Sequence, residues 1–410
     1  MDSGKTQTVQ KEDNGSQWVI PRSRQYIRIS FAFFLAGFVT FSLLYCTQPL
    51  LPEYTAEFGV SPAEASLAVS LATSALAFSI FVAGALSESL GRKDVMAFSI
   101  LCASLLAILS AFMPYWSLFL ALRLLQGIVL GGVPAVAMAY LAEEIHPKGL
   151  GLAMGQYIAG TALGGMMGRV LIGAFTDWFG WRYAIGFLGG LNLVCSAGFI
   201  FLLPASRNFI RKAHLPFRYH KAAWKRHILD NRLKALFASG FIAMGVFVTV
   251  YNYIGFRLTQ SPYQLTQTQV GLIFLIYISG MIASSVAGSL ADRLGRGHIM
   301  LCGVFISLSG ILISLNTSLV LVIIGIALIT VGFFVTHTVA SGWVGQLARG
   351  TKGHASSLYL LFYYLGSSLI GSSGGWMWDH GGWNYIVLYT LILLSAGLVL
   401  ALYMFRREYR

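Results

Sequence analysis

The sequence predicts an all-α membrane protein with twelve transmembrane helices in two pseudo-symmetric six-helix bundles. Three observations predict this fold class. The 410 residues are 56% hydrophobic and 10% charged, with a mean hydropathy of +0.71, which is too apolar for a soluble chain of this length. The chain contains twelve apolar runs of membrane-spanning length, and one group of residues recurs about half a chain later.

The lengths of the apolar runs define the spans, because about 20 mostly apolar helical residues cross a bilayer core of about 30 Å. The predicted spans are 29–51, 67–86, 95–112, 118–141, 151–175, 184–203, 235–254, 270–290, 299–315, 319–344, 355–377 and 386–405. The predicted organisation is therefore a cytoplasmic tail (1–25), a six-helix bundle (26–204), a basic cytoplasmic linker (205–234), a second bundle (235–405) and a short cytoplasmic tail (406–410).

Basic residues occur in alternate loops and predict the orientation of the chain. They gather before the first span, between spans two and three, in the linker and after the last span. The positive-inside rule places these segments in the cytoplasm, so both termini are expected on the inner side of the cell (inner or plasma) membrane. The polar segment through Gln25 has no signal-peptide pattern and is expected to be an unstructured tail.

The linker is strongly basic. It contains nine lysines and arginines and a single acid, Asp230. A basic segment with interspersed aromatic residues could bind RNA, but we expect anionic lipid headgroups of the inner leaflet as its partner and no nucleic acid. The formal net charge of +13 has the same explanation, and the expected oligomeric state is a monomer.

Two stretches recur with nearly the same spacing. "GALSESLGRKDVM", which begins at Gly84, matches "GSLADRLGRGHIM" at an offset of 204 residues. "GAFTDWFGWR", which begins at Gly173, matches "GWMWDHGGWN" at an offset of 202 and aligns Asp177 with Asp379. A period of half the chain predicts a duplicated six-helix unit, which is typical of transporters that bind their substrate between two halves.

The stretch from Gly84 resembles the signature loop of the major facilitator superfamily, G-x-L-[ST/A]-[DE]-x-x-G-R-[KR]. The second copy departs from this pattern at Gly297, where a basic residue is usual. In span four, "RLLQG" also fits a pattern of the family. The resemblance covers essentially all twelve spans, and the first copy matches at Gly84, Leu86, Glu88, Gly91, Arg92 and Lys93.

In this family the acid and the arginine of the signature form a cytoplasmic latch that favours the outward-facing state. The resemblance implies this role for Glu88 and Arg92, with Glu143 and Glu144 at the inner end of span four as partners. The alternative is that these charges only cap helices and fix topology. The predicted cytoplasmic gate consists of Gly84, Glu88, Gly91, Arg92, Lys93, Asp292, Gly295, Arg296, Glu143 and Glu144.

Span five, "GTALGGMMGRVLIGAF", resembles the motif G-x-x-x-G-P-x-x-G-G of the drug and proton antiporters in this family. Gly160, Gly164 and Gly168 match the motif. Gly165 stands where the proline is expected, and Arg169 replaces the last glycine. Within the superfamily, the sequence is therefore most similar to the bacterial branch that resembles drug and proton antiporters.

Two arginines lie inside predicted spans. Arg123 enters span four by about seven residues, or about 10 Å, and Arg169 is similarly close to the outer end of span five. Each costs at least a few kcal/mol in a bilayer unless it faces a cavity or a partner, and no carboxylate occurs at that depth. Either their guanidinium groups bind an anionic group of the substrate, or Arg123 bonds backbone carbonyls and Arg169 pairs with Glu53.

Glu53 and His337 are the candidates for proton coupling. His337 is the histidine well inside a span, and the ordinary imidazole pKa of about 6.5 suits a proton carrier. A packing role is the alternative for this histidine. In the superfamily, spans one, four, seven and ten line the central cavity. The expected substrate-binding residues are Tyr45, Gln48, Arg123, Gln126, Arg169, Tyr251 and Asn252.

The expected function is secondary active transport by alternating access, with proton-coupled efflux of small amphiphilic or drug-like molecules as the first hypothesis. A proton-coupled carrier of an organic anion or a sugar-like metabolite is the second, and a transporter-like receptor or sensor is the alternative from another class. The sequence contains no nucleophile with its base, metal cluster or nucleotide loop, so we expect no enzymatic activity, metal or cofactor, and a proton gradient as the driving force.

Overall fold

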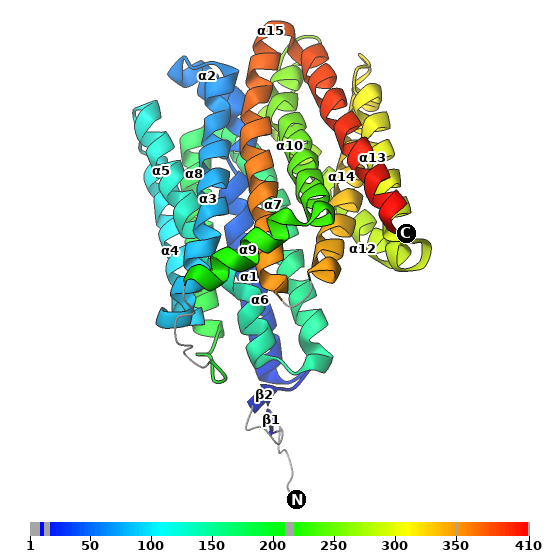
Figure 1. The fold of residues 1–410 in the computed structure, drawn as a ribbon. Helices are drawn as coiled ribbons and strands as arrows, with labels where there is room; N and C mark the ends of the chain where they lie inside the picture. Colours follow the sequence, from blue (N-terminus) through cyan, green and yellow to red (C-terminus); the bar gives the residue numbers. More distant parts are fainter. Residues whose placement is uncertain (1–8, 12–16, 210–216, 349–350, 409–410) are drawn as a thin grey trace, which may run out of the picture.

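The computed structural model describes residues 9–11, 17–209, 217–348 and 351–408, which are almost entirely helical (Figure 1). The first half contains α1 (Arg24–Tyr45), η1 (Gln48–Leu50), α2 (Leu51–Phe58), α3 (Pro62–Leu90), α4 (Arg92–Ser110), α5 (Trp116–Leu130), α6 (Gly132–Glu144), α7 (Pro147–Phe179) and α8 (Trp181–Leu202). The second half contains α9 (Phe217–Leu229), α10 (Asn231–Thr259), α11 (Gln267–Ile273), η2 (Phe274–Ile276), α12 (Tyr277–Leu294), α13 (Arg296–Ile313), α14 (Leu319–Leu347) and α15 (Lys352–Glu408).

The helices confirm the twelve predicted spans. Span four is divided into α5 and α6 at Gly131, and span eight continues from α11 through η2 into α12. Spans eleven and twelve both belong to α15, which loses helical geometry at Gly381 and Gly382. Because Gly382 has a φ of 57°, a conformation that suits glycine, the chain can turn there and cross the membrane again.

Polar capping residues set where several helices begin. Ser61 and Glu64 form a capping box at the start of α3, and Thr266 and Gln269 form another at the start of α11. Asp230 accepts hydrogen bonds from the backbone at the start of α10. These polar first turns extend the helices beyond the apolar runs from which the spans were predicted.

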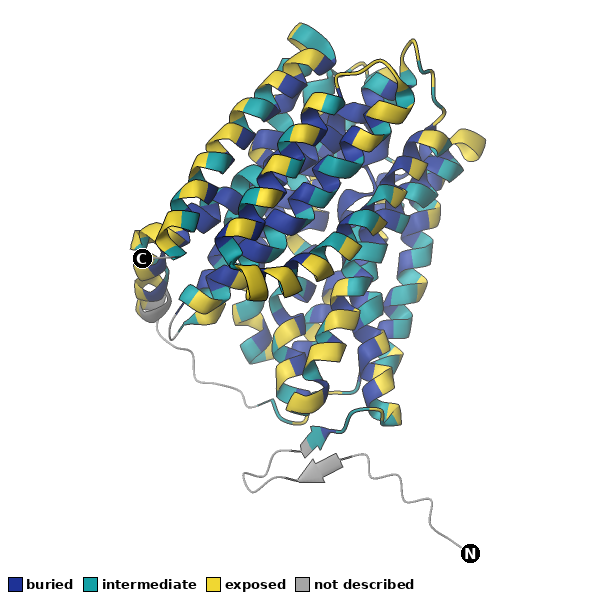
Figure 2. Ribbon diagram, turned by 90° about the vertical axis from the view of Figure 1, so that its right-hand side faces the viewer, coloured by how far each residue is buried: buried dark blue, intermediate teal, exposed yellow. Residues whose placement is uncertain are grey.

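The two bundles lie side by side, and we call the end that carries α2 and residues 260–266 the outer end, following the charge prediction (Figure 1). Direct packing between the bundles is made mainly by α15 against α3 and by α11 against α7. Figure 2 shows exposed residues along the outward faces of the helices and buried residues where helices meet. Large apolar side chains such as Phe78, Val82 and Ile282 are exposed, as expected on a surface that faces lipid.

The N-terminal segment departs from the prediction of an unstructured tail. Strands β1 (Val9–Lys11) and β2 (Gln17–Val19) pair in antiparallel register, and Val19 bridges to Ile145 at the inner end of α6. Val19 and Ile145 are both fully buried. Burial of these two apolar side chains ties the segment to the bundle, so the prediction is wrong for the described residues that precede α1.

The linker also contains more structure than the predicted loop. Its helix α9 contacts both bundles, because Trp224 packs on Phe81 of α3 and on His354 of α15 with ring centroids 5.3 and 5.9 Å apart. His227 lies 2.7 Å from the Thr351 hydroxyl just before α15. The helix therefore crosses the inner side of the molecule from one bundle to the other (Figure 1).

Candidate functional site

Arg169 lies at the centre of the junction between the two bundles. Its side chain projects from α7 and is 2% exposed. Its Nε donates to Gln48 Oε1 at 2.8 Å, and one terminal nitrogen donates to the carbonyl of Gly165 at 2.5 Å. No carboxylate forms an ion pair with it among the described residues. Arg169 is thus a buried cation held by neutral groups.

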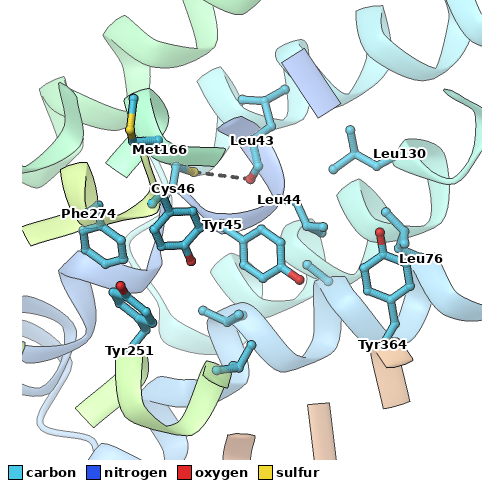
Figure 3. Packing of buried hydrophobic residues seen from close by; sticks show 14 of the residues in the cluster. Leu43, Leu44, Tyr45, Cys46, Leu76, Leu130, Met166, Tyr251, Phe274 and Tyr364 are labelled. Atoms are coloured by element: carbon cyan, nitrogen blue, oxygen red, sulfur yellow. Dashed lines mark hydrogen bonds between the residues drawn. The ribbon is translucent and has the colours of Figure 1, made fainter. Parts of the chain in front are cut away.

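Three aromatic rings surround the Arg169 guanidinium. Its central carbon lies 4.6 Å from the ring centroid of Tyr45 and 5.0 Å from those of Phe274 and Tyr277. Tyr251 lies beside Phe274 with centroids 5.0 Å apart. Figure 3 shows Tyr45, Phe274 and Tyr251 gathered at this point. Because Tyr45 comes from the first bundle and the other rings from the second, both halves contribute to this cation–π cluster.

A hydrogen-bonded chain continues from Arg169 into the second bundle. Gln48 Nε2 donates to Asn252 Oδ1 at 2.7 Å, and both side chains are buried. Gln48 lies in η1 and Asn252 in α10, so this bond joins the first membrane span of one bundle to the first span of the other. The structure therefore brings together five of the seven predicted substrate-binding residues: Tyr45, Gln48, Arg169, Tyr251 and Asn252.

Arg123, the second membrane arginine, has a different environment. Its guanidinium donates to the carbonyls of Ala68 at 2.8 Å, Leu43 at 3.0 Å and Leu44 at 2.7 Å, and to the Gln126 side chain. Gln126 in turn donates to the carbonyl of Ala103. The carbonyl alternative for Arg123 agrees with this geometry, in which Arg123 and Gln126 tie helices of one bundle together.

The pairing of Arg169 with Glu53 that the sequence suggested is wrong. Glu53 instead accepts a hydrogen bond from the Gln267 side chain at 2.9 Å. The reason is geometric. Arg169 turns toward Gln48 in η1, whereas Glu53 lies in the next helix, α2, at the outer end of the molecule.

His337 belongs to a separate aromatic cluster inside the second bundle. Its Nδ1 lies 2.9 Å from the Tyr359 hydroxyl, and its ring centroid lies 4.7 Å from that of Tyr363 and 5.8 Å from that of Phe333. Glu53 lies at the junction between the bundles. The two candidates for proton coupling therefore occupy different parts of the protein.

The hydrogen bonds that join the two bundles directly, within the part of the chain that the structure describes, all lie in the outer half. The Asp177 carboxylate accepts from the backbone N–H groups of Gln267 at 3.0 Å and Thr268 at 2.7 Å. Farther in, serines of α3 and α15 form a polar seam. The seam consists of Ser70 and Ser74 on α3 and Ser368 and Ser372 on α15.

The first signature loop is held within its own bundle. Gly91 has a φ of 108° and allows the sharp turn from α3 into α4. Arg92 forms an ion pair with Glu143 at 2.9 Å, donates to the Ser87 hydroxyl at 2.6 Å and lies over the ring of Phe209. These contacts join α3, α4, α6 and the start of the linker.

The second signature loop has a similar arrangement. Gly295 has a φ of 94°, and Arg296 pairs with Asp292 one turn earlier at 2.8 Å. Glu408 at the end of α15 accepts from the backbone N–H groups of Arg296 and Gly297, both at 2.7 Å. Gly297 thus supplies a backbone donor where the family signature has a basic side chain.

Two predicted gate partners are placed differently from the expectation. Glu144 does not pair with Arg92 but accepts from Ser206, Arg207 and Asn208 at 2.5 to 2.8 Å, which anchors the start of the linker. Glu88 forms no ion pair with Arg92 in this conformation, because Arg92 turns toward Glu143. Lys93 lies in the first turn of α4, and Gly84 lies in α3 with open space beside it.

The family model described as Major Facilitator Superfamily matches residues 33–262 and 236–410. The chain belongs to this superfamily. It is 46% identical to the inner membrane transport protein YnfM of Escherichia coli (strain K12), over 96% of this chain and 94% of that protein. It is 44% identical to the MFS-type transporter YybF of Bacillus subtilis (strain 168), over 92% of this chain and 94% of that protein. Family and relatives make it a multi-pass membrane transporter, not an enzyme.

The more distant relatives include two proteins whose names describe drug resistance. The chloramphenicol resistance protein CraA of Acinetobacter baumannii and the multi-drug resistance efflux pump PmrA of Streptococcus pneumoniae are each 26% identical, over 64% and 66% of this chain and 63% and 69% of those proteins. Among solved structures, a bacterial homologue of the lysosomal transporter Spinster, inward-facing and unoccupied, aligns with a TM-score of 0.76 at 12% identity, over 94% of this chain and 98% of that chain. This likeness shows that the fold is shared.

Several residues at the junction were not predicted from the superfamily pattern. Phe274 and Tyr277 lie in an apolar span, where an aromatic residue gives no signal of its own. The serines of α3 and α15 are equally inconspicuous. Asp177 was identifiable from the internal repeat, but its partner was not. The signal that could have drawn attention to Asp177 was its position, because it is a carboxylate at the outer end of the span that also contains Arg169.

Proposed function

We propose that this transporter exports small amphiphilic molecules across the inner membrane, driven by the proton gradient. The observation that carries the proposal is the chain Arg169–Gln48–Asn252, which crosses from one bundle to the other in the outer half of the membrane region. Aromatic rings of both bundles surround it. A few polar groups among apolar walls suit a ligand with one polar and one apolar part.

Alternating access is supported by where the bundles touch. Their direct hydrogen bonds lie in the outer half, whereas Arg92 and Arg296 form their ion pairs within their own bundles at the other end. With the outer end outside the cell, this is an inward-facing arrangement. We propose that the outward-facing state exchanges the outer contacts for inner ones, and that Arg92 and Glu88 take part in the new inner contacts as the family latch does.

The direction of transport is inferred from CraA and PmrA, whose names describe drug resistance and efflux. Coupling to protons needs a titratable group that responds to the change of state. Glu53 lies at the junction that would open, bonded to Gln267 of the other bundle. His337 is the other candidate, with Tyr359 beside it.

The test uses purified protein in proteoliposomes with a pH dye inside, to which lipophilic cations, neutral sugars and organic acids are added outside. We expect a substrate-dependent pH change with at least one amphiphilic class, and loss of this change in Glu53→Gln or His337→Gln. Glu64→Gln is the control for Glu53, since glutamine can keep the capping box. His380→Gln is the control for His337, since His380 is exposed at the outer end.

Two outcomes would contradict parts of the proposal. A pH change that both variants retain would reject Glu53 and His337 as the coupling residues. Absence of any substrate-dependent flux or pH change would reject transport of these classes and favour a receptor or sensor. A carrier of an organic anion or sugar-like metabolite remains the second candidate, and the lack of a carboxylate partner for Arg169 among the described residues favours the organic anion.

A further inference from the structure

We propose that the substrate carries an anionic group that binds Arg169 and Asn252, and a flat apolar body that packs on the aromatic rings around them. This inference rests on the transport function proposed above and names the chemical class of its substrate. Four features of the junction support it: the direction of its hydrogen bonds, the unpaired charge of Arg169, the aromatic rings around the guanidinium and the engagement of the nearby acids by other partners.

The hydrogen bonds of the junction have a fixed direction. A guanidinium group only donates, so Arg169 requires the Oε1 atom of Gln48 as its acceptor. The amide nitrogen of Gln48 must then donate to Asn252 Oδ1, 2.7 Å away. This leaves Asn252 Nδ2, a buried donor without a partner in the described protein. It points toward Gly371 of α15, which has no side chain that could accept.

Arg169 and Asn252 therefore leave donors without acceptors at the junction. Two guanidinium nitrogens of Arg169 donate to Gln48 and Gly165, and no hydrogen bond is formed by the third, Nη2, within the described residues. Arg123 is the internal comparison, because all three of its nitrogens donate and three carbonyls and an amide oxygen accept. All three guanidinium nitrogens of Arg123 thus donate to protein acceptors, whereas Nη2 of Arg169 can donate to a ligand.

The positive charge of Arg169 is not offset by an ion pair with any described carboxylate. Burying an arginine without a carboxylate is unfavourable in a membrane interior. Three of the described acids at the outer end are already engaged: Glu53 by Gln267, Glu57 by Arg182 and Asp177 by the start of α11. An anionic ligand would neutralise Arg169, whereas a lipophilic cation would meet an uncompensated positive charge.

The aromatic residues restrict how the anion can approach. The rings of Tyr45, Phe274 and Tyr277 lie around the guanidinium within 5.0 Å, so an anion that reaches Nη2 has to pass between aromatic rings. The hydroxyls of Tyr45 and Ser367 are also buried without a hydrogen-bond partner among the described residues. The polar end of a ligand would thus meet donors, and its apolar body would meet rings from both bundles.

The experiment compares three ligands that share one ring system: 1-naphthoate, the neutral 1-naphthamide and the cationic 1-naphthylmethylammonium. Binding to the full-length protein in nanodiscs is measured by isothermal titration calorimetry. We expect 1-naphthoate to bind about 10- to 100-fold more tightly than the amide, as for a charge-assisted hydrogen bond, and the ammonium to bind weakest. Equal or tighter binding of the amide or the ammonium would overturn the inference without any mutation.

The variants assign the effect to Arg169. Arg169→Gln should bind naphthoate and naphthamide equally, and Arg169→Lys should retain part of the preference because it keeps the charge but loses the planar group. Asn252→Ala should weaken naphthoate binding less than Arg169→Gln does. Arg182→Gln is the control, since Arg182 pairs with Glu57 at the outer surface. A naphthoate preference that survives in Arg169→Gln would overturn the assignment.

Transport separates this inference from the function on which it rests. The same ligands, radiolabelled, are loaded into proteoliposomes, and their counterflow is measured. If wild-type protein moves the amide or the ammonium faster than naphthoate, the anion inference is wrong while the transport proposal stands. If it binds naphthoate selectively but moves none of the three compounds, the inference stands and the transport proposal for this class fails.

Discussion

The Asp177 carboxylate in the first bundle caps the helix that begins at Gln267 in the second bundle. Its oxygens accept the backbone N–H groups of Gln267 and Thr268, which have no acceptor within the helix itself. The negative charge also lies at the positive end of the α11 dipole. Asp379, its counterpart in the sequence repeat, accepts no hydrogen bond among the described residues. Of the two carboxylates related by the repeat, Asp177 therefore joins the bundles, and we call its contact with the start of α11 the clamp.

We predict that Asp177→Ala shifts the protein toward an outward-open state. Loss of a helix cap costs about 0.5–2 kcal/mol, and this clamp forms only when the outer end is closed, so the ratio of closed to open should fall about 2- to 30-fold. Distances between spin labels at exposed positions Ala56 and Ser261 would report the shift. Asp379→Ala should leave the distribution unchanged, and an equal shift in both variants would contradict the clamp.

The close contact between Gly173 of α7 and Gly271 of α11 predicts a second way to open the outer end. A Cβ at Gly173 would lie 2.5 Å from the Gln267 carbonyl and 2.9 Å from Gly271 Cα, which is too close for either. We expect Gly173→Ala to destabilise the outer-closed state by about 1–3 kcal/mol through this overpacking. The distance between the spin labels at Ala56 and Ser261 measures this opening. Gly155→Ala on the same helix, with open space around it, is the matched control.

The fold was predictable because bilayer thickness sets the length of each span, and errors occurred where polar residues belong to helices. The helix α3 begins at Pro62, five residues before the predicted span, since Ser61 and Glu64 form a polar capping box that hydropathy excludes. The helix α9 was missed because its sequence is basic rather than apolar. Hydropathy therefore predicts which segments cross the membrane better than where their helices end.

The site was predictable only as far as its polar residues. Gln48 and Arg169 are conspicuous because polar groups are rare in such spans, and the structure places them together. Phe274 was not distinguishable from other aromatic residues that face lipid. Whether Arg169 meets Glu53 or Gln48 depends on how α7 packs against α1 and η1, and that packing is not encoded in local sequence.

The ion pair of Arg92 and Glu143 predicts different effects for Glu143 of α6 and for Glu88 of the signature loop. Arg92 makes two hydrogen bonds to the Glu143 carboxylate, and its side chain is 10% exposed. We expect Glu143→Gln to lower the stability of the inward-facing protein by about 1–3 kcal/mol, as for hydrogen bonds to a charged group, and Glu88→Gln to change it by less than about 0.5 kcal/mol.

Thermal unfolding in detergent, followed by circular dichroism, compares the two substitutions. The restoring variant Arg92→Glu with Glu143→Arg controls for loss of the pair rather than of one side chain. Equal loss of stability in Glu88→Gln and Glu143→Gln would show that Glu88 also supports this conformation. The latch interpretation predicts instead that Glu88 matters for transport rate, through the outward-facing state, more than for stability.

The exposed face of α9 predicts a site for anionic lipid. Arg218, Lys221 and Lys225 are all exposed, while Trp224 packs against the helices of both bundles, so the helix presents its basic side chains away from the protein. A lysine or arginine close to an anionic membrane surface contributes about 1 kcal/mol of binding. Replacing all three with glutamine should therefore reduce the number of phosphatidylglycerol molecules retained by the purified protein in native mass spectrometry.

Two controls test whether the effect depends on the charge of the lipid and on the position of the substitution. Phosphatidylcholine, which has no net charge, should be retained equally by both forms. Arg182→Gln at the outer end should retain as much phosphatidylglycerol as wild type. Unchanged retention in the triple variant would mean that the positive charge of α9 serves membrane orientation alone.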